Sequence, residues 1–459
     1  MNESPKQAQR ESIILRVLWM LVFVLVWQLA ELLLELGYDG LLAAHDYRVA
    51  GPPARTFRIA YPAAGDTLAV HAADFAEYAA CYEQAWTTPG ARRALAHVPS
   101  YMIFDDHEVT DDWNADAEWT AVLHSPRDPL STWPMTVTDA LAAYWVYQGW
   151  GNLAPQQLAS DPRDKVLAEA RRTGRDALPA LRRLIHQRAV MPMAPKQPHG
   201  NRLPWNFSIP AAGAPFLVVD LRTDRDVHGD GRISAARWNW IRRELTATRS
   251  AVAFLVLPVP FLLPDPMLFA FRNPWFTGKL AGSKSTTAFR RGSDIEHPAG
   301  NPVWDQIKGL LAELQKSPTT LKTIVIVSGD VHFSCNLDGQ LPKASSGPRL
   351  LQLISSGLRQ RISDAKQGQL VSAYRGWLNT VSSAEGVDKH RGIVITLGGL
   401  AKDGRTDNFI YPPSFAVVTT RIVPFGPKGR TVPVPLVEQQ HFVADPRAGV
   451  LPWTKRHMT

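Results

Sequence analysis

Three short apolar runs in this sequence each lead directly into acidic residues. They are YMIF at 101–104, followed by Asp105; PFLVV at 215–219, followed by Asp220; and TIVIVS at 323–328, followed by Gly329 and Asp330. Continuous apolar runs rich in β-branched residues are typical of strands that are buried on both faces of a sheet. In open α/β sheets, ligands bind just beyond the carboxyl ends of such strands. The pattern therefore predicts a buried sheet with a polar site along one edge.

Segments with helical spacing alternate with these runs. Apolar residues recur at the helical period in 74–86, 235–246 and 303–315. A fourth apolar run at 253–257 ends at Pro258, where we expect the strand to stop. The alternation of strands and helices predicts a layered α/β domain.

The overall composition is that of a globular protein. Of the 459 residues, 45% are hydrophobic and 20% are charged, which allows a large core. The formal net charge of +8 suits an anionic partner such as a phosphoester, a nucleic acid or a lipid headgroup. No block of Lys and Arg with interleaved aromatic residues is present, so we expect no specific nucleic-acid binding. The two cysteines, Cys81 and Cys335, are too few for a disulfide framework.

The N-terminal segment 13–36 is unusually apolar, and its stretch 17–29 has no charged residue. Basic residues at 6, 10 and 16 precede this stretch, and acidic residues at 31, 35 and 39 follow it. The positive-inside bias would then place the N-terminus in the cytoplasm and the main domain outside. The same pattern suits a long buried helix, because the uncharged part is shorter than the about 20 residues of a spanning helix. The sequence leaves open a membrane-anchored extracytoplasmic domain and a cytoplasmic one.

The first acidic block offers several chemical functions within one turn. Hydrolysis of a phosphate ester needs metal ions, a metal-bound hydroxide as nucleophile and an acid for the departing alkoxide. Asp105-Asp106-His107-Glu108 offers a carboxylate ligand, an imidazole acid and a carboxylate that can orient the imidazole. We therefore regard this block as a candidate catalytic segment.

The second block, Gly329-Asp330-Val331-His332, offers two further ligands. Side chains at i and i+2 of an extended segment lie on the same side. Asp330 and His332 are therefore expected to share a metal ion.

The two blocks together resemble the PhoD-like phosphatases, the alkaline phosphatase D type. The resemblance rests on MIFDDHEVTDDWN at 102–114, IVIVSGDVHFS at 324–334 and the intervening VVDLRTDR at 218–225, which follow one another in the family's order. The likeness covers roughly residues 75–400. It implies a metallophosphoesterase-like α/β fold, a layered sandwich of two mixed β-sheets flanked by helices. It also implies two metal ions in a complete site, with iron and calcium favoured.

The resemblance implies specific roles for the matched residues. Asp106, Asp330 and His332 would be metal ligands. His107 would be the general acid or contact the phosphate in the transition state, and Glu108 would orient His107.

Further roles follow less directly from the same motifs. Asp105 would orient the metal ligands without binding the metal itself. Asn114 and Arg222 would contact the substrate, since a guanidinium can meet a phosphate with two hydrogen bonds. Asp220 would be a supporting carboxylate, and a structural ion pair between Asp220 and Arg222 is the alternative. Asp111 and Asp112 are further candidates for ligand or substrate contacts.

The chain departs from the family ahead of the first block. The family's early ligand strand and its GDxxYAD-like segment are not found, and the one Gly-Asp pair before residue 100, Gly65-Asp66, lacks the tyrosine and the second carboxylate. The chain thus resembles a PhoD-like domain without its N-terminal metal-ligand block. We expect an apolar helix at 1–40, an incomplete PhoD-like metallophosphatase domain at 41–400 and a β- and turn-rich extension at 401–459.

Three functional hypotheses follow. The leading one is metal-dependent hydrolysis of phosphate mono- or diesters, with a metal-bound hydroxide as nucleophile and His107 as acid. The alternative is a degenerate or truncated PhoD-like domain that binds phosphate or a single metal without turnover. A third is a structural membrane protein in which the motif residues are incidental. Substrate identity and oligomeric state are not set by any feature of the sequence.

Overall fold

The computed structural model of the 459-residue chain describes its central and C-terminal parts. The described residues are 58–59, 69–70, 72, 74–109, 113–114, 133–190, 202–211, 214–223, 225, 233–262, 303–316, 320–331, 333–340, 348–356, 385–388, 393–397, 410, 414–425, 432–445 and 449–458. The apolar segment 13–36, Asp111, Asp112 and His332 lie outside them. The expected boundaries at 40 and 400 and the membrane association of 13–36 therefore remain predictions.

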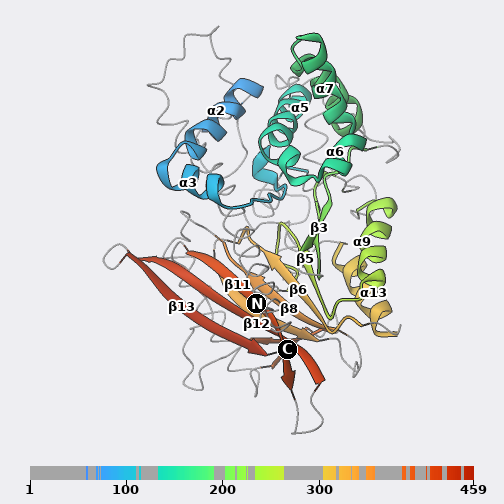
Figure 1. Ribbon diagram of the computed structural model, residues 1–459, viewed down its shortest axis with the longest axis vertical. Helices are drawn as coiled ribbons and strands as arrows, with labels where there is room; N and C mark the ends of the chain where they lie inside the picture. The colour runs from blue at the N-terminus through green and yellow to red at the C-terminus, as the bar shows by residue number, and fades with distance from the viewer. Residues whose placement is uncertain are drawn as a thin grey trace, which may run out of the picture.

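The centre of the fold is an eight-stranded mixed sheet (Figure 1). Its strands, in spatial order, are β3 (Phe207–Ala211), β4 (Ala214–Val218), β5 (Val252–Val256), β6 (Thr323–Ser328), β8 (Arg349–Ile354), β7 (Cys335–Gln340), β10 (Ile393–Leu397) and β9 (Glu385–Asp388). The four strands β4, β5, β6 and β8 are parallel to one another. Their carboxyl ends therefore meet at one edge, as the apolar runs predicted.

Helices cover one face of this sheet. Helices α9 (Ala235–Ala247) and α13 (Val303–Lys316) lie on the same side in Figure 1. Leu255 of β5 and Ile326 of β6 share a buried cluster with Ile241 of α9 and Leu311 of α13. Full burial of each such side chain contributes about 1.5–3 kcal/mol. The helices predicted at 235–246 and 303–315 are confirmed.

A separate three-stranded sheet covers the other face. It consists of β11 (Ser414–Phe425), β12 (Val432–Asp445) and β13 (Gly449–Met458), all antiparallel. Phe254 and Val325 of the large sheet pack in one cluster with Ala416 and Val437 of the small sheet. The α/β fold class and its layered arrangement are confirmed. The second sheet is antiparallel rather than mixed, because hairpins between consecutive strands can only pair them antiparallel.

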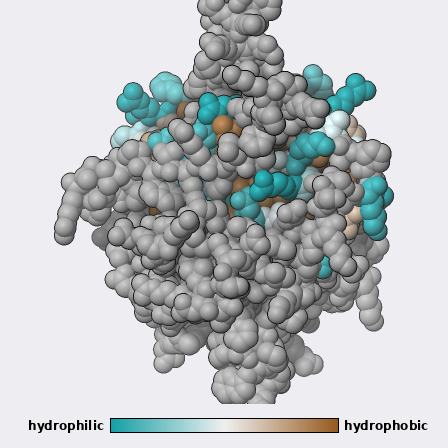
Figure 2. All heavy atoms as spheres, turned by 90° about the horizontal axis from the view of Figure 1, so that it is seen from below, coloured by the Kyte–Doolittle hydropathy of each residue, from teal (hydrophilic) through white to brown (hydrophobic). Residues whose placement is uncertain are grey.

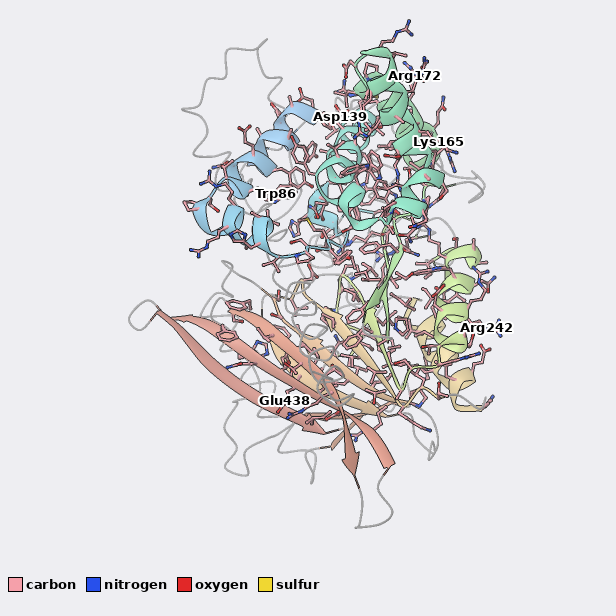
Figure 3. All side chains as sticks on the ribbon, in the orientation of Figure 1. Trp86, Asp139, Lys165, Arg172, Arg242 and Glu438 are labelled. Atoms are coloured by element: carbon pink, nitrogen blue, oxygen red, sulfur yellow. The ribbon has the colours of Figure 1, made fainter. Side chains whose placement is uncertain are left out.

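A helical lobe stands beyond the carboxyl edge of the large sheet (Figure 1). It comprises α2 (Phe75–Trp86), α3 (Pro89–His97), α5 (Trp133–Tyr144), a π-helical turn (Trp145–Gly149), a 3-10 turn (Trp150–Asn152), α6 (Pro155–Ser160), α7 (Pro162–Thr173), α8 (Leu178–Ile185) and a second π-helical turn (His186–Val190). The aromatic face predicted for 74–86 packs into the core of this lobe, with Tyr78 and Tyr82 buried. Trp86 of α2 and Asp139 of α5 mark the two helices in Figure 3.

The prediction of a strand at 101–104 is wrong. Met102, Ile103 and Phe104 are buried as predicted, but the segment forms no ladder and has no regular secondary structure. The backbone of Met102 is bonded instead by the side chain of Asn152. A side-chain amide has replaced the neighbouring strand as partner for this stretch.

The described surface carries few large apolar side chains. Met135 and Val146 are the two large hydrophobic residues that stand out as exposed among the described residues. On the face seen in Figure 2, most of the coloured side chains are hydrophilic. None of the helices in the described part of the chain combines the length and the apolar character that a membrane crossing requires.

Candidate metal centre

Three buried carboxylates converge at the carboxyl edge of the large sheet. One side-chain oxygen from each of Asp105, Asp106 and Asp330 lies within 4.8 Å of the others. Each of the three residues is at most 9% exposed. Three like charges cannot share a buried site at neutral pH unless cations or protons compensate them. Oxygen donors grouped in this way are the chemistry that hard divalent cations prefer.

The sheet positions Asp330. It is the second residue after β6, and its backbone adopts a left-handed conformation with φ of 73°. A non-glycine residue pays a conformational cost of order 1–3 kcal/mol in sparsely populated regions, and such residues cluster at functional sites. The turn after β6 thereby aims a carboxylate at the sheet edge instead of continuing the strand.

Asp105 and Asp106 lie in the segment 98–109, which follows α3. Asp106, His107 and Glu108 form a single 3-10 turn. His107 is half-buried, whereas its neighbours in the turn are buried. The imidazole is therefore the side chain of this turn with access to solvent.

Arg222 contacts both aspartates, Asp105 just before this turn and Asp106 within it. Its Nε lies 3.0 Å from Asp105 Oδ1, and its Nη2 lies 3.2 Å from Asp106 Oδ1. The Arg222 side chain is 1% exposed. The guanidinium thus neutralises part of the acidic charge, and the contacts shown for it lie within the centre rather than on an open surface.

Asp220 shapes the turn that carries Arg222. Its Oδ1 accepts hydrogen bonds from the backbone N–H groups of Arg222 at 2.8 Å and Thr223 at 3.0 Å, and its Oδ2 accepts one from the Thr223 hydroxyl. The guanidinium of Arg222 pairs with Asp105 and Asp106 instead. Asp220 therefore supports the centre through the backbone.

Asn114 also contacts Arg222, through the backbone carbonyl group of that residue. Its φ is 58°, and its Nδ2 donates a hydrogen bond to the carbonyl oxygen of Arg222 at 2.6 Å. Asn114 is 1% exposed. The structure thus brings Asn114 next to the acidic centre, with its amide engaged in holding the Arg222 turn.

Glu108 is fully buried behind the turn. Its Oε2 accepts the Asp105 N–H at 2.9 Å, and its Oε1 accepts a hydrogen bond from Gln148 Nε2 at 3.1 Å. Burial, followed by the negative charge of Asp105, raises the pKa of Glu108 from 4.5 to about 8. These contacts tie Glu108 to the backbone of its own loop, whereas the sequence suggested an orienting role toward His107.

Gln148 and Asn152 are site residues that the motifs did not reveal. Both are buried amides in the two turns that follow α5. Gln148 bonds Glu108, and Asn152 bonds the backbone of Met102. An amide inside the otherwise apolar and aromatic stretch 140–150 is the signal that could have identified Gln148. Of the predicted ligands, Asp106 and Asp330 lie together, and Asp105 joins them.

One comparison with known protein families agrees with the resemblance over part of the chain. A family model described as PhoD-like phosphatase matches residues 48–166. A solved structure of PhoD overlays 86% of this chain on 64% of its own length, with 12% identity and a TM-score of 0.43. This chain therefore spans less than two thirds of that protein. A comparison with curated proteins gave no match.

The family match begins ahead of residue 75, where the motifs first resembled the family, and it ends well before residue 400. It contains the Asp105–Glu108 block and Gln148. Over residues 48–166 the chain is thus similar in sequence to the PhoD-like phosphatases.

Proposed function

We propose that this protein hydrolyses phosphate esters with the help of a divalent cation held by Asp105, Asp106 and Asp330. The observation that carries the proposal is the convergence of three buried carboxylates from two segments more than 200 residues apart. Ionised buried groups are stable only when they are paired or coordinate a metal. Arg222 supplies one positive charge, so the donor set leaves room for a divalent cation.

His332 would complete this donor set, as the spacing of Asp330 and His332 predicts. Carboxylates with imidazole suit manganese, iron, zinc or calcium, and the family resemblance favours iron with calcium. Two ions in a complete site are the family's arrangement, and the second ion would need donors beyond the three described carboxylates.

The residues of the chain would divide the work as follows. A cation held by Asp105, Asp106 and Asp330 would supply neutralisation of the phosphate oxygens and activation of water for attack. Arg222 holds Asp105 and Asp106 in place for binding. His107, the half-buried member of its turn, would donate a proton to the departing alkoxide.

A second candidate function is favoured by the position of Arg222. Its guanidinium already forms ion pairs with two of the three carboxylates, Asp105 and Asp106. That arrangement suits a domain that binds one cation or a phosphate group without turnover. The two candidates differ in whether His107 supports a hydrolytic rate.

The test measures hydrolysis of p-nitrophenyl phosphate and bis(p-nitrophenyl) phosphate by the full chain with added Mn²⁺ or Ca²⁺. The variants are Asp330→Asn, His107→Ala and Arg242→Gln. Arg242 lies on the outer side of α9, away from the centre (Figure 3), and serves as the control. We expect His107→Ala to reduce the rate by at least about 100-fold, the usual contribution of general acid–base catalysis. Asp330→Asn should also reduce the rate, because it removes a ligand of the cation. Cation binding without a His107-dependent rate would favour the second candidate.

A further inference from the structure

The segment that carries Asp105 and Asp106 is held by side chains rather than by a ladder. Tyr101–Asp105 has no regular secondary structure, although Met102, Ile103 and Phe104 are buried. Buried backbone groups need hydrogen-bond partners wherever they lie. The partners of this segment therefore decide where its carboxylates point.

Asn152 holds the start of the segment. Its Oδ1 accepts the N–H of Met102 at 2.7 Å, and its Nδ2 donates to the Met102 carbonyl oxygen at 2.6 Å. One side chain thus satisfies both polar groups of one residue, as a neighbouring strand would. The hydroxyl of Tyr144 donates to the same carbonyl at 3.4 Å.

Gln148 holds the end of the segment through Glu108. Its Nε2 lies 3.1 Å from Glu108 Oε1 and 3.0 Å from the Tyr82 hydroxyl. The other oxygen of Glu108 accepts the N–H of Asp105. A continuous path of hydrogen bonds therefore runs from Tyr82 on α2, through Gln148 and Glu108, to the backbone of the first carboxylate.

Gln148 and Asn152 belong to an irregular end of one helix. Helix α5 passes into a π-helical turn that contains Gln148, and a 3-10 turn that ends at Asn152 follows. A Cβ at Gly149, between them, would lie 3.1 Å from Trp145 Cδ1, so this turn is closely packed. π-Helical turns frequently occur at functional sites. Here the turn presents both amides to the same segment.

We propose that Gln148 is a positioning residue for the acidic centre, which acts through Glu108 on the backbone of Asp105, while Asn152 fixes the other end of the segment. The inference rests on the proposed function for its consequence, which is cation affinity. Its structural part does not depend on that function. The alternative is that both amides only stabilise the helical lobe.

The experiment compares the full chain with Gln148→Leu, which keeps the volume and removes the hydrogen bonds. Thr138→Val is the matched control: Thr138 is also buried on α5 and bonds Pro134 O and His186 Nδ1, away from the segment. The exchanged pair Glu108→Gln/Gln148→Glu tests rescue. In it, the amide at 108 accepts the Asp105 N–H and donates to the carboxylate at 148.

Two quantities are measured for each protein. Hydrogen exchange of the Asp105 amide in the metal-free chain reports the positioning itself, and Mn²⁺ titration by calorimetry reports its consequence. We expect Gln148→Leu to speed the exchange about tenfold, as local opening becomes easier. We expect it to weaken Mn²⁺ binding about 10–100-fold, the usual cost of losing a group that supports a ligand. Thr138→Val should match wild type in both, and the exchanged pair should recover most of the affinity.

The outcomes separate this inference from the proposed function. Failure of wild type to bind Mn²⁺ would count against the proposed function, and the exchange data would still decide the positioning role. The inference is overturned if Asp105 exchanges no faster in Gln148→Leu than in Thr138→Val. It is also overturned if wild type binds Mn²⁺ and Gln148→Leu binds it as tightly.

Discussion

The candidate metal centre joins two regions that are held in different ways. Asp330 follows β6, which is bonded along its length by β5 and β8. Asp105 and Asp106 follow a segment whose contacts to the helical lobe come from individual side chains such as Gln148 and Asn152. A ladder spreads the positioning of a residue over many backbone bonds, whereas the segment depends on a few side chains. Substitutions remote from the carboxylates should therefore disturb the Asp105 region more than the Asp330 region.

The largest effect on stability should come from the residue that links the two aspartates. Arg222→Met leaves Asp105 and Asp106 buried without their cationic partner. Loss of one member of a buried ion pair costs about 3–5 kcal/mol of unfolding free energy. Urea unfolding of the metal-free chain measures this loss, and added Mn²⁺ should restore part of it. A loss below about 1 kcal/mol would show that Arg222 is not the counter-ion of this centre.

The next effect concerns the pH dependence of stability. The pKa of Glu108 is raised to about 8, so the folded state binds a proton that the unfolded state has released above about pH 4.5. Its contribution to stability is complete below that value and is lost as pH rises toward 8. Relative to Glu108→Gln, the unfolding free energy of the metal-free wild type should fall by up to about 1.4 kcal/mol per pH unit in this window. Parallel curves for the two proteins would contradict the burial of this carboxyl group.

A smaller effect is expected at Asn152. Asn152→Ala leaves the N–H and carbonyl of Met102 without the amide that bonds both. A buried polar group left unsatisfied costs about 1–3 kcal/mol. Hydrogen exchange should quicken at Met102 and remain unchanged at Leu257, whose N–H bonds Val327 O in the sheet. Equal acceleration at both amides would erase the distinction between the two regions.

The smallest effect should come from an exposed ion pair outside both regions. Arg242 of α9 pairs with Glu313 of α13, and the two side chains are 49% and 37% exposed. Exposed pairs of this kind contribute little to stability. Arg242→Gln should leave the thermal midpoint and Mn²⁺ binding at wild-type values. A clear loss of Mn²⁺ binding would mean that the centre is sensitive to surface charge at long range.

The same contrast explains what the sequence could reveal. The runs at 215–219, 253–257 and 323–328 lie on β4, β5 and β6 within a residue or two, because a strand buried on both faces leaves a continuous apolar pattern. The family resemblance implied that Asp106 and Asp330 would meet at one site, although Asp106 does not follow a strand. A second sheet and a β-rich tail at 401–459 were expected, but the antiparallel pairing of β11, β12 and β13 was not.

The side-chain contacts that hold the Asp105 region could not be predicted from the sequence in the same way. The bonds from Gln148 to Glu108 and from Asn152 to Met102 join residues 40 and 50 positions apart. The contact between Arg222 and Asp105 spans 117 positions. Such contacts leave no periodic trace in the sequence, so Asp105 was assigned a supporting role and 101–104 a strand. The motif identified the acidic block, and the helical lobe sets its geometry.

Cation binding by wild type and Asp330→Asn tests the central claim most directly. Elemental analysis after loading with Mn²⁺ and desalting gives the ions per chain, and calorimetry gives the affinity. The account predicts at least one bound ion in wild type and, in Asp330→Asn, a loss of affinity greater than the about 10–100-fold cost of losing a supporting contact. Equal Mn²⁺ content and affinity in the two proteins would contradict a metal centre built from Asp105, Asp106 and Asp330.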